Sequence, residues 1–386
     1  MDIIALKSEF IRLYGEGKIR VFHSPGRVNL IGEHIDYNGG YVFPCALDFG
    51  TFACVRKRED NKLNLASTNF DLKVTADLDN LIYDEKDDWA NYPKGVMKVM
   101  VDAGYKVGGM DILVSGNIPN GAGLSSSASL EVLTGVVISE LFNNGAVDRV
   151  EIVKLSQKAE NHFVGVNCGI MDQFAVGMGK KNKAILLDCN SLKYDYAEVN
   201  IGDYSLVIMN TNKRRALSES KYNERRAECD EALSILQKLK NIGALCELTV
   251  EEFNALAHNI EKENVRKRAK HAVYENERVK KAYDCLNKGA LKEFGELLIQ
   301  SHDSLKDLYE VTGKELDTLV YEAIKAPGCI GARMTGAGFG GCAIALVDKA
   351  LLEDFIAQVK TNYENIIGYA PDFYFSGIGE GAEELK

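Results

Sequence analysis

The stretch that most constrains the fold is residues 121–129, Gly-Ala-Gly-Leu-Ser-Ser-Ser-Ala-Ser, which precedes an apolar-rich segment at 130–141. The glycines let the backbone approach a ligand closely, and the apolar segment predicts a helix. A glycine-rich turn that leads into a helix binds anions, because free N–H groups and the positive end of the helix dipole face the ligand. We therefore predict a nucleotide phosphate site here, with serine hydroxyls available to Mg²⁺, which prefers oxygen ligands.

This loop differs from the two commonest phosphate-binding motifs. The spacing of Gly116 and Gly121 fits a Walker motif, but Ala and Gly follow where Lys and Ser/Thr are required. A dinucleotide fingerprint would need a third glycine at the position of Ser126. The loop alone also fits a surface turn that caps a helix, since serine is a common N-cap.

The chain has 386 residues, which exceeds the usual size of one hydrophobic core. We predict two domains, residues 1–195 and 196–386, because the composition changes near residues 202–204. Hydrophobic residues make up 46% and charged residues 26%, as in ordinary globular proteins. The net charge of −10 argues against non-specific nucleic-acid binding and against an anionic membrane surface.

The nine cysteines include no Cys-x-x-Cys pair, and most lie among apolar residues. We expect reduced, buried thiols of a cytoplasmic protein rather than disulfides or a zinc site. Residues 1–15 predict an amphipathic helix without the features of a signal peptide, and no apolar run has the length of a membrane span. The scattered charges suggest no partner surface, so a monomer without membrane or nucleic-acid partners is expected.

Strand-like runs alternate with helical ones along the chain. Strands are predicted at 19–24, 41–48, 51–57, 63–67, 70–76, 110–115, 184–188, 204–209, 342–347 and, as the last strand, 372–376. Helices are predicted at 92–103, 130–141, 149–164 and 350–361, with a long charged helical region at 213–239 and further helices up to 326.

A polar, glycine-rich segment at 26–40 carries four groups that can be charged, Arg27, Glu33, His34 and Asp36. The carboxylates suit the hydroxyls of a polyol. Arginine suits a transferring phosphoryl group, because it is always charged and forms bidentate bonds. A loop that only makes its own turns and surface ion pairs is the alternative interpretation.

Asp172 is the lone acid in the apolar stretch 163–178. A carboxylate there is costly to bury unless it is paired or functional, and Arg27 is an obvious candidate partner. Asp172 capping a helix is the alternative. Upstream, Glu160 is a candidate Mg²⁺ ligand opposite Ser127, although such a residue also fits a solvated helix face.

A second glycine-rich segment spans 331–342. Its glycines at 336, 338 and 341 match the dinucleotide spacing, but they precede a strand, whereas the fingerprint follows one. We predict that this loop packs near the first phosphate loop. Tyr222 lies in the charged run 218–226, which is typical of a solvated face, although a tyrosine there could stack on a sugar.

These segments occur in this order over most of the chain and together resemble the GHMP kinase superfamily. Residues 27–38 are similar to the galactokinase signature within it, Arg-Val-Asn-Leu-Ile-Gly-Glu-His-Thr-Asp-Tyr-Asn, except that Ile35 replaces Thr. The resemblance implies an α+β fold in two lobes. The N-terminal lobe would be like the second domain of ribosomal protein S5, the C-terminal lobe would have a ferredoxin-like core, and the active site would lie between them.

The resemblance also implies an ATP-dependent sugar kinase that phosphorylates the C1 hydroxyl of α-D-galactose with Mg²⁺, the first step of galactose catabolism. Asp172 would be the catalytic base, and Arg27 would stabilise its charge and that of the γ-phosphoryl group. The other implied residues are the sugar contacts Glu33, His34, Ile35, Asp36, Gly169 and Tyr222, the nucleotide contacts Ser67, Gly121, Ala122, Gly123, Leu124, Ser125, Ser126 and Ser127, and the metal ligands Ser127 and Glu160.

Two alternatives stay open. Relatives with nearly the same motifs phosphorylate N-acetylgalactosamine or arabinose, and others are galactose sensors without catalysis. The intact serine run at 125–127, together with Arg27 and Asp172, favours an enzyme over a sensor.

Overall fold

The computed structural model describes residues 1–119, 122–213 and 218–385. Within these ranges the strands form a six-stranded, a four-stranded and a three-stranded sheet. No helix in the described ranges has the length and apolar character needed to cross a membrane. All nine cysteines lie in these ranges and remain thiols rather than disulfides, and five of them are buried.

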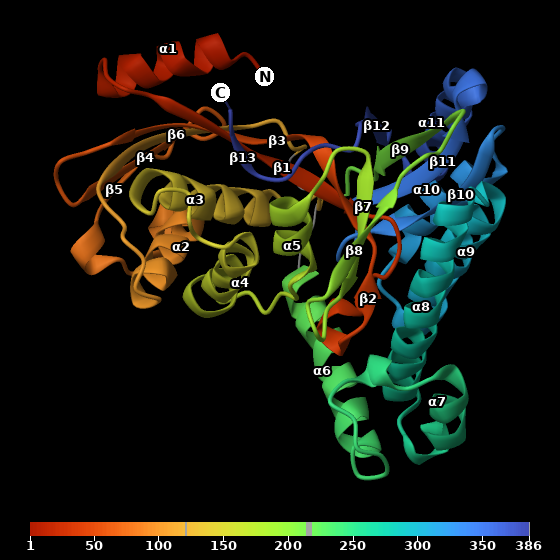
Figure 1. The fold of residues 1–386 in the computed structure, drawn as a ribbon. Helices are drawn as coiled ribbons and strands as arrows, with labels where there is room; N and C mark the ends of the chain where they lie inside the picture. Colours follow the sequence, from red (N-terminus) through yellow and green to blue (C-terminus); the bar gives the residue numbers. More distant parts are fainter. Residues whose placement is uncertain (120–121, 214–217, 386) are drawn as a thin grey trace.

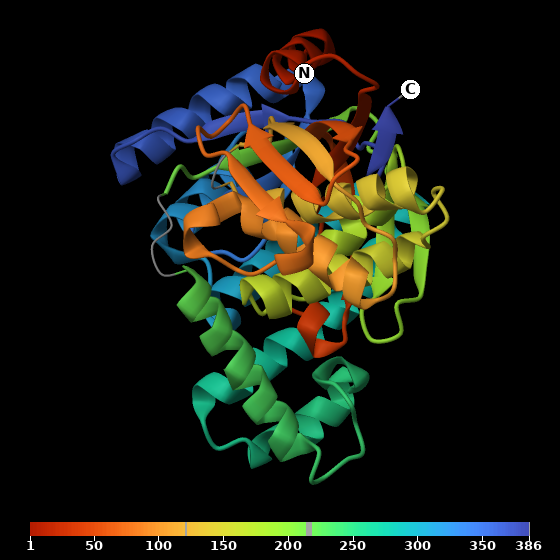
Figure 2. The ribbon, with the colours of Figure 1, turned by 90° about the vertical axis from the view of Figure 1, so that its left-hand side faces the viewer.

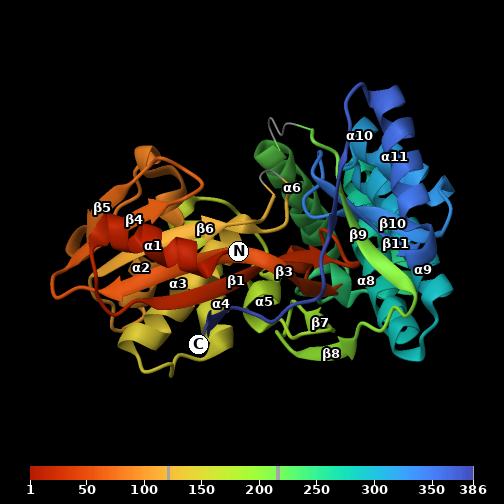
Figure 3. The same ribbon diagram turned by 90° about the horizontal axis from the view of Figure 1, so that it is seen from above.

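The six-stranded sheet has the order β13-β1-β3-β6-β4-β5. Only the β4–β6 pair in this sheet is parallel among the described strand pairs. Helices α2, α3, α4 and α5 lie on one face and α1 on the other (Figures 1 and 3). The elements of this half are α1 Ile3–Tyr14, β1 Arg20–Asn29, β3 Pro44–Lys57, β4 Lys62–Ser67, β5 Val74–Asp77, α2 Asn91–Asp102, β6 Met110–Gly116, α3 Ser126–Phe142, α4 Arg149–Ala159, α5 Met171–Met178 and β13 Glu383–Leu385.

The other half is built on the antiparallel sheet β10-β11-β9-β12, against which α9, α10 and α11 pack. Helix α8 packs on α9 and α6, and α6 and α7 project away from both large sheets (Figure 2). These elements are β9 Tyr204–Asn210, α6 Ser218–Leu236, α7 Val250–Leu256, α8 Glu263–Lys288, α9 Leu291–Ser304, α10 Gly313–Lys325, β10 Cys329–Thr335, β11 Cys342–Asp348, α11 Leu352–Ile367 and β12 Asp372–Phe375.

The small sheet β2-β7-β8 lies between the two halves (Figure 1). It consists of β2 Tyr41–Val42, β7 Lys183–Asp188 and β8 Tyr194–Glu198. Short 3₁₀ or π helices complete the described elements: η1 Asp36–Asn38, η2 Leu78–Asn80, η3 Glu85–Ala90, η4 Glu160–Val164, η5 Leu245–Glu247, η6 Ala257–Asn259, η7 Leu305–Tyr309 and η8 Lys349–Leu351.

The hydrophobic core follows the same division. The helix-covered face of the six-stranded sheet packs Phe22, Val55 and Ile112 against side chains of α2, α3 and α4. On the opposite face, Leu6 and Phe10 of α1 form a small separate cluster with the sheet, as the amphipathic pattern of residues 1–15 predicts. The largest cluster joins the end of β1, α5 and the small sheet to the second half of the chain.

Several predicted element boundaries were wrong. The strands expected at 41–48 and 51–57 are a short β2 and one continuous β3, because Gly50 still pairs with Pro25 of β1 and the strand continues past a bulge to Ala46, which pairs with Arg27. The strand expected from 70 begins at Val74, since Asn69 bonds both backbone groups of Gly116 and turns the chain there. The helix expected over 149–164 is α-helical only to Ala159, where η4 follows.

Other elements were missed at the sequence level. β8 and β10 were not predicted, and β12 is not the last strand because β13 returns to the edge of the first sheet beside β1. β10 lies in the glycine-rich region, where Gly331 allows the strand to lie against Gly295 of α9. The domain boundary at residue 195, which falls within β8, stays a prediction.

Candidate active site

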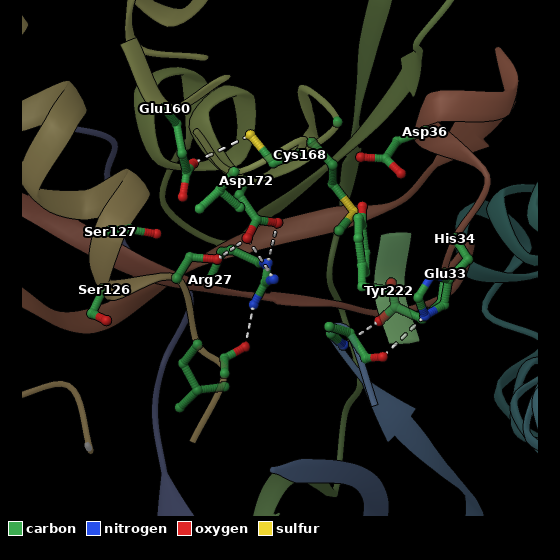
Figure 4. A pocket seen from close by; sticks show the side chains of 18 of the residues that line it. Arg27, Glu33, His34, Asp36, Ser126, Ser127, Glu160, Cys168, Asp172 and Tyr222 are labelled. Atoms are coloured by element: carbon green, nitrogen blue, oxygen red, sulfur yellow. Dashed lines mark hydrogen bonds and ion pairs between the residues drawn. The ribbon is translucent and has the colours of Figure 1, made fainter. Parts of the chain in front are cut away.

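A cavity of about 350 Å³ brings together segments that are far apart in the sequence. Its walls come from the end of β1 and the loop after it, the loop before α3, residues 160–172, α6 and the loop after β10. The predicted site residues that line it are Arg27, Glu33, His34, Asp36, Gly123, Leu124, Ser125, Ser126, Ser127, Glu160, Gly169, Asp172 and Tyr222 (Figure 4).

The remaining predicted site residues lie elsewhere. Ile35 and Ala122 are fully buried in the core and do not line the cavity. Ser67 ends β4, where its hydroxyl accepts the Asn69 N–H, and it does not line the cavity either. Gly121 falls outside the described residues.

Arg27 and Asp172 form a bidentate ion pair in the cavity wall (Figure 4). Arg27 Nε donates to Asp172 Oδ1 at 2.9 Å, and Nη2 donates to Oδ2 at 2.8 Å. Arg27 is 4% exposed, whereas the Asp172 side chain keeps 31% of its surface open. The candidate partnership predicted from the sequence is therefore present, and the helix-cap interpretation of Asp172 is wrong.

The Ser125 hydroxyl supplies a third bond, to Asp172 Oδ2 at 2.5 Å. A carboxylate has about four acceptor positions, so these bonds from described residues leave one for a ligand hydroxyl. Ser125 has a φ of 65°, a left-handed conformation that costs energy for a residue with a side chain. This unusual backbone turns the hydroxyl toward Asp172 just before α3 begins.

Helix α3 begins at Ser126, four residues earlier than predicted, so Ser126 and Ser127 form its first turn. The first N–H groups of a helix have no partner within it, and together with the dipole they favour an anion. Arg27 Nη1 donates to the Gly123 carbonyl at 2.7 Å, which fixes the preceding loop. The cavity thus has an anion-binding end beside the ion pair.

Glu160 is 6% exposed, so its interpretation as a solvated helix residue is wrong. Burial raises the pKa of Glu160, as does the nearby Asp172 charge, while hydrogen bonds from Cys168 and Ser127 oppose the rise. The amide of Gln173 donates to Glu160 at 2.6 Å and to the fully buried Glu131 at 3.0 Å. Burial and the neighbouring Glu160 raise the pKa of Glu131 well above its ordinary value.

Such a cluster of oxygen atoms suits a hard cation. No three His, Cys, Asp or Glu side chains in the described ranges are placed to bind one ion together. An ion at Glu160 would therefore need the Ser127 hydroxyl and ligand oxygens as further donors, as is usual for Mg²⁺ beside phosphates.

Glu33 lies in the loop after β1, and both of its carboxylate oxygens accept hydrogen bonds from other residues of the chain. Its Oε1 accepts the Gly336 N–H at 2.7 Å and faces Arg333 Nη1 at 3.4 Å, while Oε2 accepts from Asn29 Nδ2 at 2.6 Å. Because Gly336 and Arg333 belong to the second half of the chain, Glu33 ties the two halves together at the cavity.

Asp36 contacts Gly169 so closely that a Cβ on Gly169 would lie 1.8 Å from Asp36 Oδ2. Only glycine fits there without displacement of the carboxylate. Burial, followed by the charge of Asp172, raises the pKa of Asp36 to about 6. Ionisation of Asp36 is therefore unusually costly for a carboxylate.

The His34 ring is held at both nitrogens. Its Nε2 lies 3.1 Å from the Ala337 carbonyl, which can only accept, so Nε2 carries the proton and Nδ1 accepts from Tyr37 at 2.9 Å. Burial lowers the pKa of His34 to about 3, which keeps the ring neutral. The ring of Tyr222 lies 5.5 Å from that of His34 and adds an aromatic wall.

The two glycine-rich loops meet at the cavity, as the sequence predicts. A Cβ on Gly336 would lie 3.1 Å from the Gly123 carbonyl and 3.8 Å from Arg27 Nη2. Sequence reasoning missed the bond from Ser125 to Asp172 and the cavity residues Tyr92, Cys168, Asn223 and Ala337. None of these has a distinctive local pattern, so only the fold brings them to the site.

Comparison with known proteins covers nearly the whole chain. Residues 8–57 match the galactokinase galactose-binding signature, residues 91–180 the GHMP kinases N terminal domain and residues 282–365 the GHMP kinases C terminal domain. The chain is 66% identical over 385 residues to a galactokinase of Clostridium tetani, covering 100% of this chain and 98% of that protein. It is 57% identical over 374 residues to a galactokinase of Fusobacterium nucleatum, covering 96% of each.

Solved structures agree. The galactokinase of Lactococcus lactis complexed with galactose superimposes with a TM-score of 0.97 at 51% identity, covering 100% of both chains. A mevalonate kinase with 20% identity has a TM-score of 0.66 over 94% of this chain and 99% of that one, and so shares the fold.

Proposed function

The chain belongs to the galactokinase family of GHMP kinases, and we propose how its cavity carries out the ATP-dependent phosphorylation of galactose. Its α+β fold is the two-domain GHMP kinase fold. The proposed reaction transfers the γ-phosphoryl group of ATP to the C1 hydroxyl of α-D-galactose and yields galactose 1-phosphate and ADP. One observation carries this proposal: the Arg27–Asp172 pair lies beside the N-terminus of α3 in a single cavity.

Asp172 is proposed as the base that takes the proton of the C1 hydroxyl. Its remaining acceptor position and its 31% exposed side chain support this role. Arg27 neutralises the carboxylate from one side and, through its fixed position beside the phosphate loop, stabilises charge that develops on the transferring group. Ser125 holds Oδ2, so the carboxylate is oriented before the substrate arrives.

The loop before α3 and the first turn of the helix are proposed to bind the ATP phosphates through Gly121, Ala122, Gly123, Leu124, Ser125, Ser126 and Ser127. Ser127 and Glu160 are the proposed Mg²⁺ ligands, because Glu160 is a buried carboxylate that hydrogen-bonds the Ser127 hydroxyl. When bound there, Mg²⁺ neutralises phosphate charge and orients the transferring group. Contact of Ser67 with the nucleotide stays a prediction.

The sugar is proposed to contact Glu33, His34, Asp36, Gly169 and Tyr222, which line the same cavity as Asp172. Asp36 is the strongest candidate for accepting sugar hydroxyls. The side chains of Glu33 and His34 already bond to the second half of the chain and so fix the shape of the sugar site. Ile35 supports this wall from the core, because it is fully buried.

Finer properties are also proposed. We propose a monomeric, cytoplasmic enzyme whose ligands are galactose and ATP, without nucleic-acid or membrane partners. The net charge of −10 supports the last point. Size-exclusion chromatography with light scattering tests the oligomeric state directly.

A coupled ADP-release assay tests the function, with ATP, Mg²⁺ and a panel of galactose, N-acetylgalactosamine, arabinose, glucose and mevalonate. We expect strong turnover with galactose. Turnover with another sugar alone would retain a kinase and reject the proposed substrate. Galactose binding without any turnover would reject catalysis and favour a sensor.

A further inference from the structure

The loop that carries the sugar-binding residues, residues 29–38 (the sugar loop), is held by a helix from the other half of the molecule. Helix α8 packs against β2, the strand that follows this loop (Figure 1). Glu275 Oε1 accepts the Gly32 N–H at 3.0 Å, and His271 Nε2 lies 3.1 Å from the Glu33 carbonyl. Next to Glu275, Asn276 Oδ1 accepts the Tyr41 N–H at 2.8 Å.

His271 and Glu275 are four residues apart on α8, and therefore lie on the same face of the helix. Both are 0% exposed. Of the described residues that line the active-site cavity, none belongs to α8. These two buried titratable groups thus have no direct route to a ligand, and their contact with the active site runs through the backbone of the sugar loop.

Each of the two side chains is also held by hydrogen bonds to residues outside the sugar loop. Ser304 lies 2.8 Å from His271 Nδ1, while Ser301 donates to Glu275 Oε1 at 2.5 Å and Arg278 donates to Oε2 at 2.7 Å. The Glu33 carbonyl can only accept, so His271 carries its proton on Nε2 and accepts from Ser304. Both hydrogen bonds to the loop are therefore formed by pre-oriented groups.

The protonation states agree with this geometry. Burial lowers the pKa of His271 to about 4, so the ring is neutral near pH 7. Burial alone would raise the pKa of Glu275, but Arg278, His271 and Arg333 outweigh it and lower the pKa to about 2. Glu275 is thus an ionised acceptor for the Gly32 N–H.

The loop also has no room to move toward the helix. Gly32 has a φ of +104°, and a Cβ there would lie 2.8 Å from the Tyr41 carbonyl and 2.9 Å from Val279 Cγ2. Packing therefore stops the loop from approaching α8, and the two hydrogen bonds stop it from moving away.

We propose that His271 and Glu275 are positioning residues that set the affinity for galactose by fixing the backbone of the sugar loop at Gly32 and Glu33. The proposal rests on the proposed function of the cavity, because the loop carries Glu33, His34 and Asp36. The phosphate loop and α3 lie in the other half of the molecule, and no hydrogen bond joins them to α8 among the described residues. Galactose binding, and not ATP binding, depends on the two residues.

Glu275→Leu and His271→Leu test the proposal by separating the two Michaelis constants. Each variant leaves a backbone group of the loop without its partner, and we expect the KM for galactose to rise about 10-fold. The KM for ATP should stay within about 2-fold, since loss of one bond to the sugar loop does not reach the phosphate site. Glu275→Gln and His271→Gln, which can still accept or donate at the same positions, should recover most of the affinity.

Leu286→Ala is the matched control, because Leu286 is buried on the same helix about three turns beyond Glu275. It should lower the melting temperature without a change in the KM for galactose. Should the leucine variants fail to fold, Ser301→Ala and Ser304→Ala remove only a supporting hydroxyl. We expect each to raise the KM for galactose about 3-fold.

The results have distinct meanings. An equal rise of both KM values, or a rise with Leu286→Ala as large as with Glu275→Leu, would overturn the positioning role. So would unchanged constants in the Ser301 and Ser304 variants. If the wild-type enzyme instead used another sugar of the panel, the proposed substrate would be wrong, and the KM for that sugar would decide the role of His271 and Glu275.

Discussion

The catalytic pair and the sugar loop differ in what holds them. Arg27 and Asp172 come from β1 and α5 of the same half, and their partners Ser125 and Gly123 belong to that half as well. The sugar loop also follows β1, yet its backbone is held by α8, and Glu33 by the loop after β10. The residues proposed for phosphoryl transfer are thus assembled within one half, whereas the proposed sugar site depends on contact between the halves.

This difference predicts two classes of variant. Changes at the catalytic pair and the phosphate loop should act on kcat or on the requirement for the metal. Changes at the sugar loop and its supports should act on the KM for galactose. The distinction would be wrong if a variant of the sugar loop changed mainly kcat, or if a variant of the Arg27–Asp172 pair changed mainly the KM for galactose.

Replacement of the proposed base should have the largest effect. Asp172→Asn keeps the shape of the side chain but removes the proton acceptor, so kcat should fall by about 10²–10⁴-fold. ADP release measures the loss, and an unchanged circular dichroism spectrum shows that the fold persists. The exposed Asp102→Asn, which breaks a surface ion pair, should leave kcat unchanged. Substantial turnover by Asp172→Asn would contradict the base assignment.

The difference between the two regions also explains what the sequence could predict. Arg27, Glu33, His34 and Asp36 stand together in one short polar segment, and Asp172 is conspicuous in an apolar one. Their chemistry is therefore visible locally. The positions of most strands and helices along the chain were predicted as well, since they follow from periodicity over a few residues.

The supports of the site were not predictable in this way. His271, Glu275 and Asn276 are buried, but they lie in a helix so rich in Lys, Arg and Glu that it is typical of a solvated surface. Burial of these groups depends on packing against residues more than 200 positions away. The bond from Ser125 to Asp172 likewise depends on a left-handed backbone that serine rarely adopts.

Loss of the proposed metal ligand should have the next largest effect. Glu160→Gln should raise the Mg²⁺ concentration for half-maximal rate by about 100-fold. The KM for galactose should stay nearly constant, because Glu160 lies at the phosphate end of the cavity. Mg²⁺ titrations of the wild type, Glu160→Gln and the exposed Glu59→Gln measure this. A response of Glu160→Gln equal to that of Glu59→Gln would reject Glu160 as a ligand.

On the sugar side, Gly169→Ala should raise the KM for galactose by about 30-fold, because the added Cβ would come within 1.8 Å of Asp36 Oδ2 and displace it. Gly116→Ala is the control, since its Cβ would meet only Asn69 Oδ1 at 3.8 Å. Steady-state kinetics with both substrates distinguish the outcomes. If Gly169→Ala raised the KM for ATP more than the KM for galactose, the proposed division between the two regions would be wrong.

Ser125→Ala should lower kcat by about 10-fold, as expected for the loss of one hydrogen bond to a charged group. The predicted cause is misorientation of Asp172, so the KM for galactose should change less than kcat. Ser129→Ala removes a buried hydroxyl from the same helix that bonds Ser24 and Thr51 instead. Equal loss of kcat in both variants would show that only the stability of α3 matters.

The smallest effect concerns the charge of Asp36. Its folded-state pKa of about 6 exceeds the ordinary value of 3.8. The folded protein therefore holds this proton more tightly than the unfolded chain between these values. The contribution of Asp36 favours folding below about pH 4 and is lost as the pH rises through about 6. Asp36→Asn should accordingly stabilise the ligand-free protein at pH 8, by up to about 3 kcal/mol, and not at pH 4.

Melting temperatures at the two pH values, with the exposed Asp71→Asn as control, measure this effect, and the KM for galactose of Asp36→Asn should rise at the same time. A variant no more stable than the wild type at pH 8 would show that Asp36 ionises without cost. The expected result has a physical reason, since burial and repulsion by Asp172 both disfavour the ionised Asp36, and hydroxyl donors from a bound sugar would offset that cost. The sugar site would then be unstable by itself because it is complementary to its ligand.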